Sequence, residues 1–143
     1  MDREARLLWA MPEGELTTRE TLDYFAQVAA VPDLPNDMIE IVDFSRVTNL
    51  VSSYTGAVQI TQSYWSVGLG DRIIATVFVG GSDLGLDMAR MIQGLHQLRR
   101  PKHPLRVTRS IADIDAIVAE LRANHHGQSD AATPNEGDAG GDE

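Results

Sequence analysis

The chain has 143 residues, no cysteine and a formal net charge of −9 at pH 7. This length suits one compact domain, and the lack of cysteine excludes disulfides, a thiolate nucleophile and sulfur-ligated metal sites, which fits a reducing cytoplasm. Nucleic-acid binding depends on basic side chains that neutralise phosphates, so a chain with 12 Lys and Arg against 21 Asp and Glu is not expected to bind nucleic acid.

Membrane signals are absent from the sequence. No apolar stretch approaches the roughly 20 residues that a helix needs to cross a bilayer. The charged start MDREARLLWAMPEGE has no signal-peptide pattern. We therefore expect a cytoplasmic protein without a membrane span.

Strand and helix signals alternate from the start of the chain. Leu7, Trp9 and Met11 stand at alternate positions, which predicts a half-buried strand with these side chains on one face. The residues PEG at 12–14 predict a turn. Thr17 then opens a capping-box pattern and starts a helix, which the following prolines end.

The middle of the chain repeats this alternation. The apolar segment MIEIVDF at 38–44 predicts an inner strand that is covered on both faces. A helix is expected over 53–65, and RIIATVFV at 72–79, the most apolar segment, is expected at the sheet centre. A last strand at 105–109 follows Pro104, which is typical of a sheet edge, where a missing N–H costs little.

The segment SDLGLDMARMIQGL at 82–95 predicts a helix with one apolar stripe. The stripe is formed by Leu84, Met88, Met91, Ile92, Leu95 and Leu98. Such a stripe is how a helix docks on a sheet. Flexible methionines also recur at adaptable binding surfaces, so a ligand cavity beneath this helix is an open alternative.

The chain closes with one more helix and a polar tail. Ser110 and Asp113 mark the start of that helix. The small, polar and acidic residues from His125 onward cannot offset the entropy of ordering, so residues 125–143 are expected to be a disordered acidic tail. The strict alternation over residues 1–124 predicts a single α/β domain with a mainly parallel sheet and about four helices.

Several stretches resemble a known family. They are GELTTRETLDYF, VDFSRVTNL, and ATVFVGGSDLGLDMARMIQGL followed by LRVTRSIADIDAIVAEL. Together, over roughly residues 5–122, they are similar to the SpoIIAA-like branch of the STAS (sulfate transporter and anti-sigma-factor antagonist) superfamily. The resemblance implies a four- or five-stranded sheet, and a role in protein–protein regulation or in binding apolar or nucleotide ligands.

A pair of serines raises the question of a phosphorylation switch. In the anti-sigma-antagonist relatives, a serine in an Asp-Ser-Ser-Gly context is phosphorylated to control partner binding. The matching stretch here reads Val51-Ser52-Ser53-Tyr54, which keeps the serines but not the aspartate or the glycine. Ser52 and Ser53 are therefore candidates either for helix capping or for a phosphate that adds about −1.5 to −2 charges at a partner surface.

A glycine-rich turn is the next candidate site. Gly80 and Gly81 allow close backbone approach, and Ser82 or Asp83 begins a helix whose free N–H groups attract anions. The Asp83 carboxylate would repel a phosphate there, and the missing Gly-Lys-Ser/Thr ending excludes a P-loop. A structural turn and helix cap is the alternative interpretation.

Tyr64 and Trp65 complete the predicted ligand or partner surface, together with Gly80–Asp83, Met88 and Met91. The two aromatic residues are expected either as core or dimer contacts or, if exposed, as a partner anchor. No catalytic signature is present, and the histidines lack metal-ligand spacing. No enzyme activity, metal or cofactor is therefore expected.

The resulting hypothesis is a regulatory or binding domain of SpoIIAA-like type. It would act by protein–protein interaction, with a protein partner or as a homodimer, through the surface around the second and third helices. The alternative is a small-molecule carrier that holds an apolar, lipid-like ligand or a nucleotide between the sheet and the helices.

Overall fold

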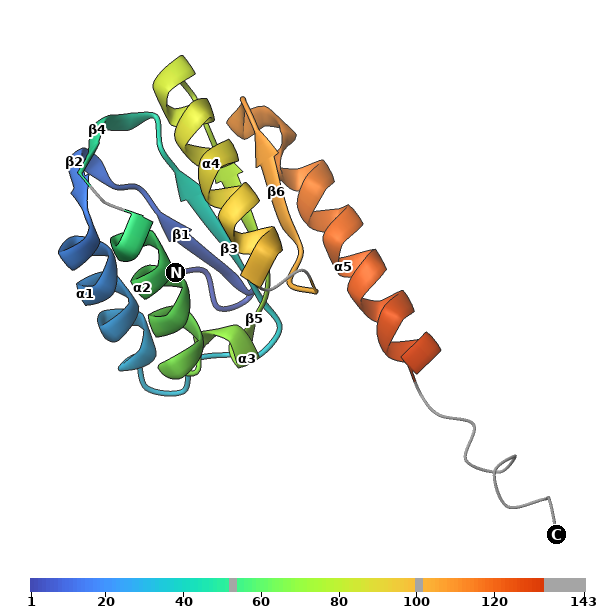
Figure 1. The fold of residues 1–143 in the computed structure, drawn as a ribbon. Helices are drawn as coiled ribbons and strands as arrows, with labels where there is room; N and C mark the ends of the chain where they lie inside the picture. The colour runs from blue at the N-terminus through green and yellow to red at the C-terminus, as the bar shows by residue number, and fades with distance from the viewer. Residues whose placement is uncertain (52–53, 100–101, 133–143) are drawn as a thin grey trace, which may run out of the picture.

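The computed structural model describes residues 1–51, 54–99 and 102–132. In chain order the elements are β1 (Leu7–Ala10), β2 (Glu13–Thr17), α1 (Thr18–Ala29), β3 (Met38–Asp43), β4 (Arg46–Val51), α2 (Tyr54–Ser66), α3 (Leu69–Arg72), β5 (Ile73–Val79), α4 (Asp83–Arg99), β6 (Leu105–Thr108), a 3-10 turn (Ile111–Asp113) and α5 (Ile114–Ala132). Figure 1 shows the helices packed around the strands. The predicted α/β class is confirmed.

The main sheet has the strand order β1-β3-β5-β6, and every pair in it is parallel. The predictions of an inner position for β3 and β5 and an edge position for β6 are confirmed. Along the chain, each new strand of this sheet is added beside the previous one, always on the same side. Because such crossovers are right-handed, α1, α2 and α4 lie on one face of the sheet (Figure 1).

The second face of the sheet is covered by α5. Residues Ile39 and Ile41 of β3 pack there with Val77 of β5, and α5 adds Ile114 and Leu121 to the same buried cluster. Alternate residues of the same strands point to the other face, because side chains along a strand alternate in direction. Both faces of β3 are thus buried, as its apolar sequence predicts.

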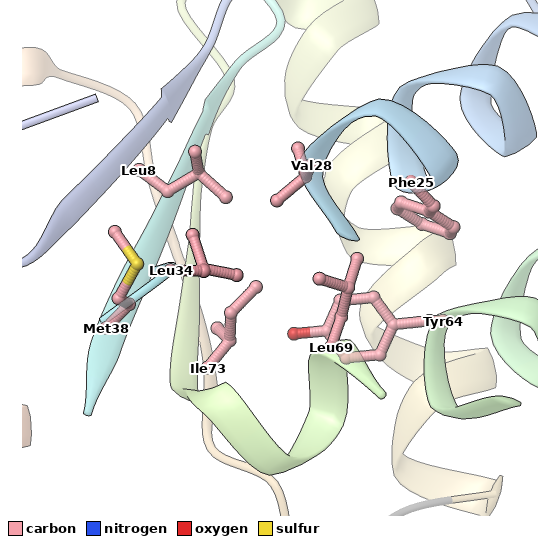
Figure 2. Close-up of a cluster of buried hydrophobic side chains, with 8 residues drawn as sticks. All are labelled: Leu8, Phe25, Val28, Leu34, Met38, Tyr64, Leu69 and Ile73. Atoms are coloured by element: carbon pink, nitrogen blue, oxygen red, sulfur yellow. The ribbon is translucent and has the colours of Figure 1, made fainter. Parts of the chain in front are cut away.

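The face below α1 and α2 holds another buried cluster. Figure 2 shows Leu8, Met38 and Ile73 from the strands facing Phe25 and Val28 from α1. This cluster closes one end of the space between the sheet and the helices. The other end is where the candidate site lies.

Two short strands form a sheet that the sequence analysis did not predict. β2 pairs with β4 in parallel, and each follows directly on a strand of the main sheet. The expected turn at 12–14 is in part the start of β2. Gly14 adopts a φ of 70° beside a shift in the strand register, so a residue typical of turns is accommodated in a bulge.

The first strand is present, and Leu7 of its predicted face packs partly buried against the α5 cluster, but Trp9 and Met11 are not buried. Leu8 is the buried residue, with 6% exposure, whereas Trp9 is 36% and Met11 is 57% exposed. The physical reason is that β1 is a sheet edge. Leu8 faces the side of the sheet that α1 and α2 cover. Leu7 and Trp9 face the opposite side, where α5 lies over the inner strands.

The prediction for α4 was wrong about half of its apolar stripe. Leu84, Met91 and Leu98 are 42%, 47% and 82% exposed. The helix instead turns its small residues inward, with Ala89 fully buried beside Met88. Small side chains allow the helix axis to approach the sheet closely, and this packing overrides the stripe of larger residues.

The C-terminal helix is longer than expected. α5 continues to Ala132, so residues 125–132, predicted to be disordered, are helical. Helices propagate more easily than they nucleate, and Ala131 and Ala132 have the highest intrinsic helix propensity. Residues 133–143, the remainder of the predicted tail, lie outside the described residues.

Candidate functional site

A cavity of about 470 Å³ lies between the main sheet and helices α1, α2 and α4. All four strands contribute to its floor, which consists of Ala10, Glu40, Val42, Thr76, Phe78 and Leu105. Glu40 and Thr76 are direct neighbours in the sheet, and Thr76 is in turn the neighbour of Leu105. Short side chains such as Thr21 and Ala57 on the helices leave the space that larger residues would fill.

Aromatic side chains dominate the wall. The chain contains three Phe, three Tyr and two Trp. The lining includes Tyr24, Phe25, Phe44, Tyr64, Trp65 and Phe78. Several of these rings meet edge to face, with centroids 5.3 Å apart for Phe25 and Tyr64 and 5.1 Å apart for Phe44 and Phe78. The aromatic residues of this chain are therefore concentrated around one cavity.

Glu40 is a buried carboxyl group in the floor of this cavity, with 4% exposure. Its Oε2 accepts a hydrogen bond from the Tyr24 hydroxyl at 3.0 Å, and its Oε1 accepts one from the Thr76 hydroxyl at 3.3 Å. Burial raises the pKa of Glu40 from 4.5 to about 7, although both hydrogen bonds oppose this rise. The group therefore changes its charge near neutral pH.

His103 extends the polar cluster behind Thr76. The Nε2 atom of His103 lies 3.1 Å from the Thr76 hydroxyl oxygen. Because Thr76 has one hydroxyl proton and donates it to Glu40, we assign the N–H to Nε2 of His103. Burial, and then the charge of His96, lower the pKa of His103 to about 4, so the imidazole is neutral and suited to this donor role.

Tyr64 brings a further hydroxyl group to the cavity. Figure 2 shows its hydroxyl pointing from α2 towards the strands. This buried oxygen has no partner of good hydrogen-bond geometry among the described residues. Burial and the charge of Glu40 raise the pKa of Tyr64, and Thr76 offsets part of that rise. The Tyr64 hydroxyl is therefore available to a ligand in the cavity.

The residues of the predicted ligand or partner surface lie in different parts of the structure. Tyr64 and Trp65 both line the cavity. Met88 is buried in the core with Phe44 and Phe78 and does not line the cavity. Met91 is exposed, away from the cavity lining.

The glycine-rich turn follows β5 and serves the local structure. A Cβ atom at Gly80 would lie 2.8 Å from the Cα of Leu86, and Gly81 adopts a φ of 70°. The Ser82 hydroxyl accepts a hydrogen bond from the Gly85 N–H at 3.0 Å. Asp83 forms an exposed ion pair with Arg109. These contacts agree with a turn and helix cap.

Two candidates from the sequence cannot be placed, and the structure adds site residues that the sequence analysis did not name. Ser52 and Ser53 lie outside the described residues, so their predicted roles are untested. Sequence reasoning missed Glu40, Tyr24 and His103 as members of a site. The sequence contained one signal for Glu40. It lies between two isoleucines in a strand predicted to be buried on both faces, where burying a charged group is costly.

Comparisons with protein-family models, with curated proteins and with solved structures find no match to this chain. Within residues 1–51, 54–99 and 102–132, none of the helices is long and apolar enough to traverse a lipid bilayer. The same residues contain no group of three or more His, Asp or Glu placed to hold a metal ion.

Proposed function

We propose that this protein is a small-molecule carrier that holds an apolar ligand between its sheet and helices α1, α2 and α4. The cavity carries this proposal. Its volume of about 470 Å³ falls in the range of sites for small organic ligands, and its wall is mainly apolar and aromatic with a few convergent polar groups. A nucleotide is disfavoured because no Lys or Arg among the described residues contributes to the lining.

The polar cluster favours ligand binding without catalysis. Each carboxyl oxygen of Glu40 already accepts a hydrogen bond from the protein, from Tyr24 or from Thr76. Such fixed bonds orient the group for recognition of a ligand.

The test is a titration with N-phenyl-1-naphthylamine, an uncharged dye that fluoresces in apolar sites. We expect saturable binding, and we expect Ala57→Leu, which fills the cavity from α2, to weaken it at least fivefold. Ala119→Leu, the same change at an exposed position of α5, is the control and should bind as the unmodified protein does. Absence of binding, or equal affinity in both variants, would contradict the proposal.

A protein partner or self-association is the second candidate. Leu84, Met91 and Leu98 are exposed at seven-residue spacing, which places them on one face of α4. Light scattering after size-exclusion chromatography, with Met91→Glu as the comparison, tests this candidate. A dimer that the substitution dissociates supports it. A monomer that captures no partner in a pull-down counts against it.

The relationship to SpoIIAA-like STAS domains is also a proposal. It is supported by the quoted sequence stretches and by a four-stranded parallel sheet, within the predicted four or five strands. The cytoplasmic location stays a prediction.

A further inference from the structure

We propose that the ligand of this cavity is an organic cation, an apolar or aromatic amine whose ammonium group binds Glu40. The inference rests on the proposed function and specifies the chemistry of its ligand. Three independent features of the cavity carry it: an uncompensated carboxylate, an aromatic wall and an acidic mouth.

The first feature is the lack of a counter-charge for Glu40. Its hydrogen-bond donors, Tyr24 and Thr76, are neutral, and within the described residues no Lys or Arg forms an ion pair with it. Neutral hydrogen bonds stabilise a buried carboxylate without cancelling its charge. Buried charges in proteins are normally paired, so a cationic ligand would supply the missing partner.

The second feature is the ring of aromatic side chains near this carboxylate. Tyr24 binds Glu40 directly, and Phe25, Tyr64, Trp65 and Phe78 line the same space. The face of an aromatic ring attracts ammonium groups, most strongly where water is excluded. The Tyr64 hydroxyl, which lacks a partner of good geometry among the described residues, offers an additional acceptor for an N–H group.

The third feature is the charge at the mouth. Among the described residues, the charged side chains that line the cavity are all glutamates, and two of them, Glu13 and Glu20, are exposed. Glu13 is paired with Arg46 at 2.8 Å, so Glu20 is the carboxylate of the exposed part of the lining that forms no ion pair within the described residues. A cleft lined by negative charge concentrates cations and repels anions. Fatty acids and phosphates are therefore disfavoured as ligands.

The experiment compares three ligands of one shape by isothermal titration calorimetry at pH 8, where Glu40 is ionised. The probes are 2-phenylethylamine, 2-phenylethanol and 3-phenylpropanoate. We expect the amine to bind at least tenfold more tightly than the alcohol, and the carboxylate to bind most weakly. Equal or tighter binding of the alcohol or the carboxylate would overturn the inference.

Glu40→Gln should remove the preference for the amine and leave the affinity for the alcohol within about twofold. Glu15→Gln removes the same charge at an exposed position of β2 that does not line the cavity, and should keep the preference. A Glu40→Gln variant that retains the preference would overturn the inference. Since the ligand comparison uses the unmodified protein, it decides the question even if a variant fails to fold.

Proton release supplies a second readout. At pH 6 most of the Glu40 groups are protonated, so a bound ammonium should expel that proton, and the measured heat should depend on the ionisation enthalpy of the buffer. No proton release on binding of the amine would contradict a role of Glu40. If the alcohol and N-phenyl-1-naphthylamine bind but the amine binds no more tightly, the carrier stands and the cation inference fails. If none of them binds, the carrier proposal itself fails.

Discussion

The two faces of the main sheet use the same strands for different purposes. Towards α5, β3 and β5 present aliphatic side chains, such as Ile39, Ile41 and Val77, which pack in one buried cluster with residues of the helix. Towards α1, α2 and α4, the alternate positions carry Glu40 and Thr76 beneath a cavity. The α5 face is closely packed and contributes stability. The cavity face is less closely packed and leaves a space that polar groups help to line.

The largest expected effect comes from deleting atoms on the α5 face. Ile41→Ala leaves a void in a filled cluster and should lower the free energy of unfolding by about 2–5 kcal/mol. Ile60→Ala on the cavity wall, where the side chain is half-buried and has fewer packing neighbours, should cost less than half as much. Urea denaturation measures both. Equal losses would contradict the division between the two faces.

The next effect in size is the pH dependence due to Glu40, whose carboxyl faces Tyr24 and Thr76, with Tyr64 also on the cavity wall. Between pH 4.5 and 7 the folded protein retains the Glu40 proton and the unfolded chain releases it, so stability falls as the pH rises. Glu40→Gln should be more stable than the unmodified protein by about 3 kcal/mol at pH 8 and equally stable at pH 4. Denaturation at both pH values checks this.

Glu15→Gln is the control for that prediction, because Glu15 is exposed. A stabilisation of Glu40→Gln that is the same at pH 4 and pH 8 would show that charge burial is not its cause.

His103 should act in the opposite direction. Its pKa is lowered from 6.5 to about 4, so the unfolded chain gains a proton between these values and the folded protein does not. Stability should therefore fall as the pH drops from 6.5 to 4. Relative to His103→Gln, which keeps an N–H donor for Thr76, the unmodified protein should lose about 2–3 kcal/mol over this range. Constant relative stability would refute a buried neutral imidazole.

The smallest expected effect concerns the turn after β5. Ser82→Ala removes the hydroxyl that accepts the Gly85 N–H and should cost about 1 kcal/mol, the usual value of a helix cap. Binding of N-phenyl-1-naphthylamine should not change, because Ser82 does not line the cavity. Loss of binding in a folded Ser82→Ala variant would indicate that this turn takes part in ligand binding.

The sequence was most informative where one physical preference dominated. Continuous apolar runs identified β3 and β5 as inner strands, and Pro104 marked β6 as an edge. The capping pattern at Thr17 is confirmed, since its hydroxyl accepts the Glu20 N–H at 3.1 Å. Each of these signals is local and depends little on the rest of the fold.

The features that escaped prediction depend on contacts between distant segments. β2 and β4 become strands only because they pair with each other. The orientation of α4 depends on how closely Ala89 approaches the sheet, which overrides the stripe of Leu84, Met91 and Leu98. The site joins Tyr24, Glu40 and His103 from three separate segments, and no spacing in one sequence reveals such a meeting.

The most direct test of the carrier uses the two tryptophans, which lie on different faces. Trp65 lines the cavity, and Trp9 pairs in register with Ile41 on the α5 side. Bromobenzene, an apolar quencher that acts at contact distance, is titrated into Trp9→Phe and Trp65→Phe, each of which keeps one tryptophan. We predict saturable quenching of Trp65 and only weak, unsaturable quenching of Trp9. Emission from Trp65 that shows no saturable quenching would contradict a ligand site in this cavity.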